Sequence, residues 1–171
     1  MTDQQKLSTD LIPNFTYEEL SIGQSARLLR TLTMQDIQVF AAVSGDTYPS
    51  QLDSHDAKAC ALDGSFAHGM WGGALISALL GHQFPGPGSI QLEQDFHFMR
   101  PVRLGDTLSV IATVVAKEKK NEIQLHCTIE NQNGEQVLHG LARIVAPTHK
   151  MHRPWPNPAP LQVFDPEARF R

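Results

Sequence analysis

The chain has 171 residues, of which 41% are hydrophobic and 19% are charged. This length and composition suffice for the core of one globular domain and are too small for two. The formal net charge is -4, and lysines and arginines stand singly except at Lys117, Lys119 and Lys120, so no basic face is available for binding a nucleic acid.

The first residues, 1–14, are polar and predict a flexible N-terminus. They contain neither the apolar segment of a secretory signal nor the arginine-rich pattern of a transit peptide, so we expect a cytoplasmic protein. The two cysteines, Cys60 and Cys127, lie in unlike contexts and predict buried thiols instead of a disulfide framework. The eight histidines show no metal-binding spacing, and we expect no metal.

The first regular elements are a strand over 25–33 and a helix over 34–43. Thr33 is a favourable N-cap for this helix, because Asp36 follows three positions later as in a capping box. Gly45 ends the helix, since glycine readily adopts the left-handed conformation of a helix end.

The segment after the helix is rich in turn residues and places Asp46 on a loop. A short helix is expected over 53–62, followed by a turn at Asp63-Gly64. A lone aspartate in such a loop is often structural, because its side chain caps the turn around it.

An uncharged apolar run over 70–80 predicts a central helix that is buried on all sides and ends at Gly81. This helix is too short to span a bilayer. Gly72 and Gly73 each cost about 1 kcal/mol relative to alanine in a helix, so they indicate close approach by a sheet or a ligand, with packing as the favoured reason. The backbone N–H groups at its start, His68-Gly69, would suit a developing oxyanion.

The second half of the chain alternates apolar and polar residues, which is typical of antiparallel strands. A strand begins at Ser89, with Ile90, Leu92, Gln94, Phe96 and Phe98 on one face. Further strands cover 107–117, 122–131 and 137–145, and Asn133-Gly134 predicts a hairpin. Residues 148–171 contain many prolines and predict an extended tail that follows a domain of residues 15–147.

Two motifs carry a resemblance to a known family. The segment from Ser44 to Asp53 reads S-G-D-T-Y-P-S-Q-L-D, and A-H-G-M follows at residues 67–70. These segments resemble the MaoC-type dehydratase and R-specific enoyl-CoA hydratase family, whose signature is roughly S-G-D-x-N-P-x-H-x-D, a spacer and A-H-G-M. The match covers about residues 25–147. It implies a hotdog fold of the α+β class, in which an antiparallel sheet wraps around a central apolar helix.

The resemblance implies a lyase of fatty acid metabolism that adds water to a trans-2-enoyl-CoA and gives a 3-hydroxyacyl-CoA. It implies no organic cofactor. Because a sheet around one helix has open edges and such edges are usually paired, we expect a homodimer with continuous sheets and its site near the interface. A Pro-rich end of this kind also resembles that of MaoC-like domains fused ahead of acyl-phosphate-forming transferases, so relatives with an acyltransferase domain are expected.

The family pattern assigns roles to seven residues. The carboxylate is Asp46, the Gly69 N–H polarises the thioester carbonyl, and Gln51 stands where the family has its catalytic histidine. The residues assigned to substrate binding are Tyr48, His68, Met70 and Ser77. For His68, the competing interpretation is a helix-start histidine bonded to nearby backbone, and for Ser77 a hydrogen bond to the preceding helical turn.

Two departures from the signature bear on activity, since Gln51 replaces the histidine and Tyr48 replaces the asparagine before proline. An amide can orient a water but has no proton to exchange near neutral pH, and loss of one acid/base partner removes about 10²- to 10⁴-fold in rate. Impaired hydration and non-catalytic acyl-CoA binding both stay open, and a substitute histidine, His55 or His97, is less favoured. A thioesterase ranks last, because the central helix carries no carboxylate.

Overall fold

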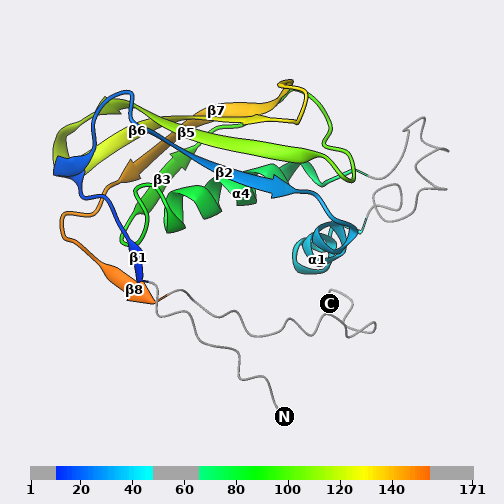
Figure 1. Ribbon diagram of the computed structural model, residues 1–171, viewed down its shortest axis with the longest axis horizontal. Coiled ribbons are helices and arrows are strands. Elements are labelled where there is room, and N and C mark those ends of the chain that lie inside the picture. Colours follow the sequence, from blue (N-terminus) through cyan, green and yellow to red (C-terminus); the bar gives the residue numbers. More distant parts are fainter. Residues whose placement is uncertain (1–10, 48–65, 155–171) are drawn as a thin grey trace, which may run out of the picture.

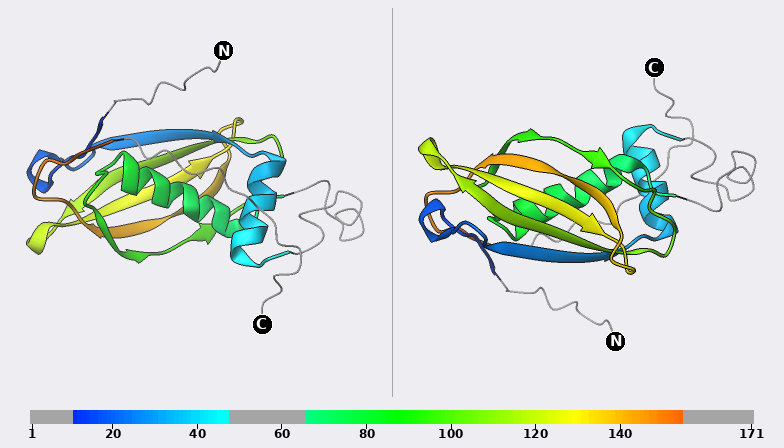
Figure 2. Two further views of the ribbon diagram at one scale, coloured as in Figure 1. Left: turned by 90° about the horizontal axis from the view of Figure 1, so that it is seen from below. Right: turned by 90° about the horizontal axis from the view of Figure 1, so that it is seen from above.

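The computed structural model describes residues 11–47 and 66–154. Its centre is an antiparallel six-stranded sheet with the order β2-β5-β6-β7-β3, and β4 also pairs with β7. The helix α4 (Gly69–His82) lies along one face of this sheet, and α1 (Met34–Ser44) lies at one end (Figures 1 and 2). The strands are β2 (Ser25–Thr31), β3 (Ile90–Gln94), β4 (His97–Phe98), β5 (Thr107–Lys117), β6 (Glu122–Glu130) and β7 (Gln136–Val145). The predicted sheet around an apolar helix is therefore confirmed.

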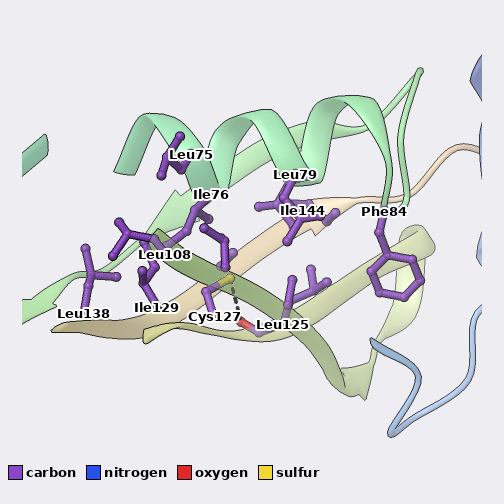
Figure 3. Packing of buried hydrophobic residues seen from close by; sticks show 14 of the residues in the cluster. Leu75, Ile76, Leu79, Phe84, Leu108, Leu125, Cys127, Ile129, Leu138 and Ile144 are labelled. Carbon is purple, nitrogen blue, oxygen red and sulfur yellow. Dashed lines mark hydrogen bonds between the residues drawn. The ribbon is translucent and has the colours of Figure 1, made fainter. Parts of the chain in front are cut away.

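The long strands form because apolar residues alternate along them and face α4 together. In the antiparallel register, Val110 of β5 lies beside Ile129 of β6, which lies beside Leu138 of β7. Figure 3 shows Leu75, Ile76 and Leu79 of α4 above the sheet residues Leu108, Cys127, Ile129 and Ile144. These side chains form the core of the domain.

The helix α4 differs from its prediction in two ways. It continues through Gly81 to His82, and it is not buried on all sides, because Met70, Ala74 and Ser77 are exposed. These three positions recur every three or four residues and therefore share one face of the helix. The uncharged pattern does not show which face the sheet covers, since small residues suit either environment.

The predicted reason for the helix glycines is confirmed for both positions. A Cβ atom at Gly72 would lie 3.2 Å from Leu138 and 3.4 Å from Ile129, and one at Gly73 would lie 2.9 Å from the ring of Phe96. Side chains of the sheet and its edge therefore pack closely against both glycines.

The helix α1 forms as predicted and extends one residue further, to Ser44. The Oγ1 atom of Thr33 accepts a hydrogen bond from the Asp36 N–H at 3.1 Å, and Asp36 accepts one from the Thr33 N–H at 2.9 Å. Gly45 ends the helix with a φ of 74°. The helix expected over 53–62 lies outside the described residues.

The strand predicted from Ser89 is broken at Asp95 into β3 and β4. The Asp95 carboxylate accepts a hydrogen bond from the Leu141 N–H. The backbone N–H of Asp95 donates to the Leu141 carbonyl oxygen at 3.0 Å. A Cβ atom at Gly140 would clash with the Asp95 carbonyl oxygen, so this close approach depends on glycine. The contact of Asp95 with β7 therefore interrupts the strand, although the apolar–polar alternation of the sequence continues through Asp95.

A small two-stranded sheet joins segments beyond the predicted domain limits of 15 and 147. In it, β1 (Leu11–Pro13) pairs with β8 (His152–Pro154). Two short 3-10 helices complete the fold, η1 (Tyr17–Glu19) and η2 (Lys119–Asn121). No helix among the described residues has the length and apolar character needed to cross a membrane.

The described cysteine, Cys127, is a buried thiol in β6, as expected. Burial, together with the charge of Asp95, raises the pKa of this thiol to about 12. Since the thiolate is the reactive form, Cys127 is inert near neutral pH.

Candidate active site

Asp46 follows the C-terminal glycine of α1 and is held by the helix end. Its N–H donates to the Ser44 Oγ atom at 3.2 Å, and that hydroxyl donates to the Phe40 carbonyl at 2.6 Å. The Asp46 side chain is 55% exposed. Its backbone is therefore anchored while its carboxylate can reach solvent or a ligand.

His68 joins the Asp46 loop to the start of α4. Its side chain is only 2% exposed, and its Nε2 atom lies 2.7 Å from the Asp46 carbonyl oxygen and 4.0 Å from Oδ2 of the same residue. Phe40 packs against the imidazole, with ring centroids 5.2 Å apart. These contacts bring the Asp46 loop and the start of α4 together.

Gly69 is the first residue of α4, directly after the N-cap His68. The first N–H groups of a helix have no acceptor within the helix and carry partial positive charge. The ring of Phe98 lies 3.4 Å from the position that a Gly69 side chain would take, so glycine leaves room for this packing. The helix start can therefore offer hydrogen-bond donors to a carbonyl oxygen.

A pocket of about 330 Å³ begins at this helix start. It passes between α4 and the sheet, and its walls are mostly apolar. The lining residues are Ala67, His68, Gly69, Gly72, Phe98, Met99, Arg100, Pro101, Val102, Leu108, Ile129, Val137 and Leu138. Such a pocket suits an apolar chain attached to a polar head at the helix start.

The other predicted site residues lie elsewhere or outside the described part. Met70 and Ser77 are on the exposed face of α4, and Ser77 is about 12 Å along the helix from Gly69 at 1.5 Å per residue. Within one chain, Ser77 is therefore not brought to the Asp46 loop. Tyr48 and Gln51 lie outside the described residues.

Of the two histidines considered as substitutes, the structure describes His97, which does not lie at this site. His97 stacks on His139, with ring centroids 4.9 Å apart. Neighbouring Leu138 and Gly140 of β7 are buried toward α4, so alternation puts His139 on the opposite face of the sheet. His55 lies outside the described residues, which contain no cluster of three potential metal ligands.

Sequence reasoning did not assign Phe40 or Ser44 to the site. Phe40 belongs to the apolar residues of α1, and Ser44 opens the S-G-D motif. The available signal for a role of these two residues was that α1 ends directly before the loop that carries Asp46.

An antiparallel sheet around one apolar helix, with a carboxylate loop at the start of that helix, defines a hotdog protein with a candidate acyl site. The chain belongs to the MaoC like domain family, whose model matches residues 19–137.

Relatives and solved structures agree with this assignment. The chain is 37% identical to the (R)-specific enoyl-CoA hydratase of Rhodospirillum rubrum, over 81% of this chain and 95% of that protein. It is also 37% identical to the (R)-specific enoyl-CoA hydratase of Aeromonas caviae, over 76% and 98%. The structure of the R-hydratase PhaJ1 from Pseudomonas aeruginosa, in its unliganded form, matches with a TM-score of 0.88 and 40% identity, covering 91% of this chain and 100% of that chain.

Proposed function

We propose that this protein is an R-specific enoyl-CoA hydratase, a lyase that adds water to a trans-2-enoyl-CoA and yields a 3-hydroxyacyl-CoA. The observation that carries the proposal is the contact of His68 with Asp46, which places a carboxylate loop beside the start of α4 and its apolar pocket. The names of the two 37% identical relatives support the same reaction.

The proposed chemistry uses the Asp46 carboxylate and the Gly69 N–H, which lie on the two segments that this contact joins. Asp46 takes a proton from water as the oxygen bonds to C3 of the enoyl group, and the electron pair of the double bond moves toward the thioester oxygen. The Gly69 N–H stabilises the negative charge that develops there. The electron pair then returns from the thioester oxygen to C2, which takes the proton held by Asp46 and completes the addition.

Gln51 lowers the expected rate, because a glutamine side chain cannot supply the proton that the family's histidine exchanges. Two alternatives therefore remain, a slow hydratase and a domain that only binds acyl-CoA. They differ in turnover, but both would bind acyl-CoA in the same pocket. The apolar pocket between α4 and the sheet is the shared feature, so we expect acyl-CoA binding in both cases.

We also propose that the protein forms a homodimer through the edge strand β3 and the exposed face of α4. Ile90 and Leu92 of β3 are 60% and 43% exposed, and Met70 of α4 is 53% exposed. Edge strands in native proteins are usually paired or covered.

Light scattering should give the dimer mass at micromolar concentration, and Ile90→Glu should shift it toward the monomer. The control is Ile22→Glu, which alters an isoleucine that is 67% exposed in another part of the chain and should leave the mass unchanged. A monomeric wild type would refute the proposal.

The hydration of crotonyl-CoA, followed by loss of the enoyl-thioester absorbance, tests the reaction. The wild type should consume crotonyl-CoA, and Asp46→Asn should lower the rate by about 10²- to 10⁴-fold, because an amide cannot accept the proton. Glu18→Gln, in an exposed segment before β2, is the control and should retain the rate.

Calorimetry with butyryl-CoA separates the two candidates. Binding without turnover would favour the acyl-CoA-binding domain over the enzyme. The absence of both binding and turnover would refute both functions. Turnover that Asp46→Asn leaves unchanged would refute the assigned chemistry.

A further inference from the structure

The imidazole of His68 has one hydrogen-bonded nitrogen and one without a partner among the described residues. Its Nε2 atom lies 2.7 Å from the Asp46 carbonyl oxygen, whereas its Nδ1 atom is buried and has no hydrogen-bond partner there. A carbonyl oxygen can only accept, so the hydrogen of the ring is on Nε2. His68 is therefore a donor aimed at the backbone of Asp46.

The imidazole of His68 is almost completely buried among the described residues. The side chain is 2% exposed, although its residue contributes to the wall of the pocket. Phe40 of α1 covers the imidazole at a centroid distance of 5.2 Å. The His68 ring thus contacts Phe40 of α1 and Asp46 of the loop that follows α1.

His68 also holds a fixed position relative to α4. It is the N-cap of this helix, and its carbonyl oxygen accepts a hydrogen bond from the Trp71 N–H at 2.9 Å. The preceding Ala67 N–H donates to the Val102 carbonyl, also at 2.9 Å. Any shift of the His68 backbone would therefore disturb both the helix start and the neighbouring segment.

We propose that His68 is a positioning residue, which sets the distance between the Asp46 carboxylate and the Gly69 N–H through its Nε2 hydrogen bond. The inference rests on the proposed hydratase function, and it assigns His68 a role other than substrate binding. One covalent step separates His68 from Gly69, and one hydrogen bond separates it from Asp46. Since an error of about 1 Å in a reacting group can cost about 10²-fold in rate, this short link matters for turnover.

Two polar substitutions test the link. In His68→Gln the side-chain amide nitrogen can occupy the place of Nε2 and still donate to the Asp46 carbonyl, whereas in His68→Asn the amide is too short to reach it. We expect kcat for crotonyl-CoA to fall about 10²-fold in His68→Asn, with KM changed much less, and to be largely retained in His68→Gln. His126→Asn, at an exposed position of β6, is the matched control and should leave both constants unchanged. If the native rate is too low to measure, the series is made in the Gln51→His background.

A double-mutant cycle distinguishes positioning from an independent contribution. If His68 acts through Asp46, adding His68→Asn to Asp46→Asn should reduce kcat no further than Asp46→Asn alone. Multiplied losses would overturn the proposal, as would equal kcat values for His68→Gln and His68→Asn.

Hydrogen–deuterium exchange of the backbone amides around Ser44 to Thr47 supplies a readout that needs no activity. Exchange should be faster in His68→Asn than in the wild type and close to the wild type in His68→Gln, with unchanged circular dichroism. Such a result without any hydration would refute the proposed function and support the link. Unchanged exchange in His68→Asn would overturn the link, even in an active hydratase.

Discussion

The Oδ1 atom of Asn14 accepts a hydrogen bond from the backbone N–H of Met151 at 2.9 Å, across 137 positions of the chain. The side-chain Nδ2 atom of the same asparagine donates to the carbonyl oxygens of Pro87 and His149, at 3.1 Å and 2.8 Å. Asn14 is 1% exposed. It therefore fastens the segments beside β1 and β8 to the loop between α4 and β3.

We expect Asn14→Ala to lower the free energy of unfolding by about 3 kcal/mol, since each of its three hydrogen bonds contributes about 1 kcal/mol. Urea denaturation measures this change. Gln38→Ala, at an exposed position of α1, is the control and should stay within about 0.5 kcal/mol of the wild type. A loss of the same small size in Asn14→Ala would show that the junction does not contribute to stability.

Two glycines of α4 should respond in opposite directions to alanine. A Cβ atom at Gly73 would lie 2.9 Å from the Phe96 ring, whereas one at Gly81 has no neighbouring atom within 4 Å among the described residues. Overpacking should make Gly73→Ala less stable by about 1–3 kcal/mol. Helix propensity should make Gly81→Ala more stable by up to about 1 kcal/mol. Thermal melts of both variants check the contrast, and equal shifts would contradict it.

The capping box of α1 should make part of the stability dependent on pH. Partial burial opposes ionisation of Asp36, but hydrogen bonds from Thr33 and Arg30 outweigh it and lower the pKa of this carboxyl below its ordinary value of 3.8. A lowered folded-state pKa stabilises the fold above that ordinary value, and the contribution is lost as the pH falls through the folded-state pKa.

Asp36→Asn should therefore be less stable than the wild type at pH 7, and the difference should shrink as the pH falls below 3.8. Thr33→Ala should lose about 1 kcal/mol at pH 7 through loss of the N-cap. Chemical denaturation at several pH values measures both effects. A difference between Asp36→Asn and the wild type that is independent of pH would rule out this role of the carboxylate.

Gln51→His should raise the rate of crotonyl-CoA hydration by about 10²-fold or more, because it restores a second group that can exchange a proton. Adding Tyr48→Asn tests whether the phenol occupies the place of the attacking water, in which case the double variant is faster than Gln51→His alone. Asp46→Asn in the Gln51→His background should abolish the gain. A gain that survives Asp46→Asn would mean that another group accepts the proton.

The sequence by itself determined the elements that depend on neighbouring residues. The ends of α1 follow from Thr33, Asp36 and Gly45, which act within one helical turn. The hairpin after β6 follows from Asn133-Gly134, and Gly134 has a φ of 75°. Interactions of this kind are local, so the residue pattern specifies them before any tertiary contact forms.

The tertiary structure decided the features that depend on distant partners. The uncharged run of α4 does not distinguish its buried residues from Ala74 and Ser77, because the sheet alone determines which face is covered. The alternation after Ser89 does not indicate the break at Asp95, which requires the backbone of β7 beside it. The site follows the same division. The motifs indicated Asp46 and Gly69, but the His68 hydrogen bond joins residues 22 positions apart and forms only when the loop after α1 lies against the start of α4.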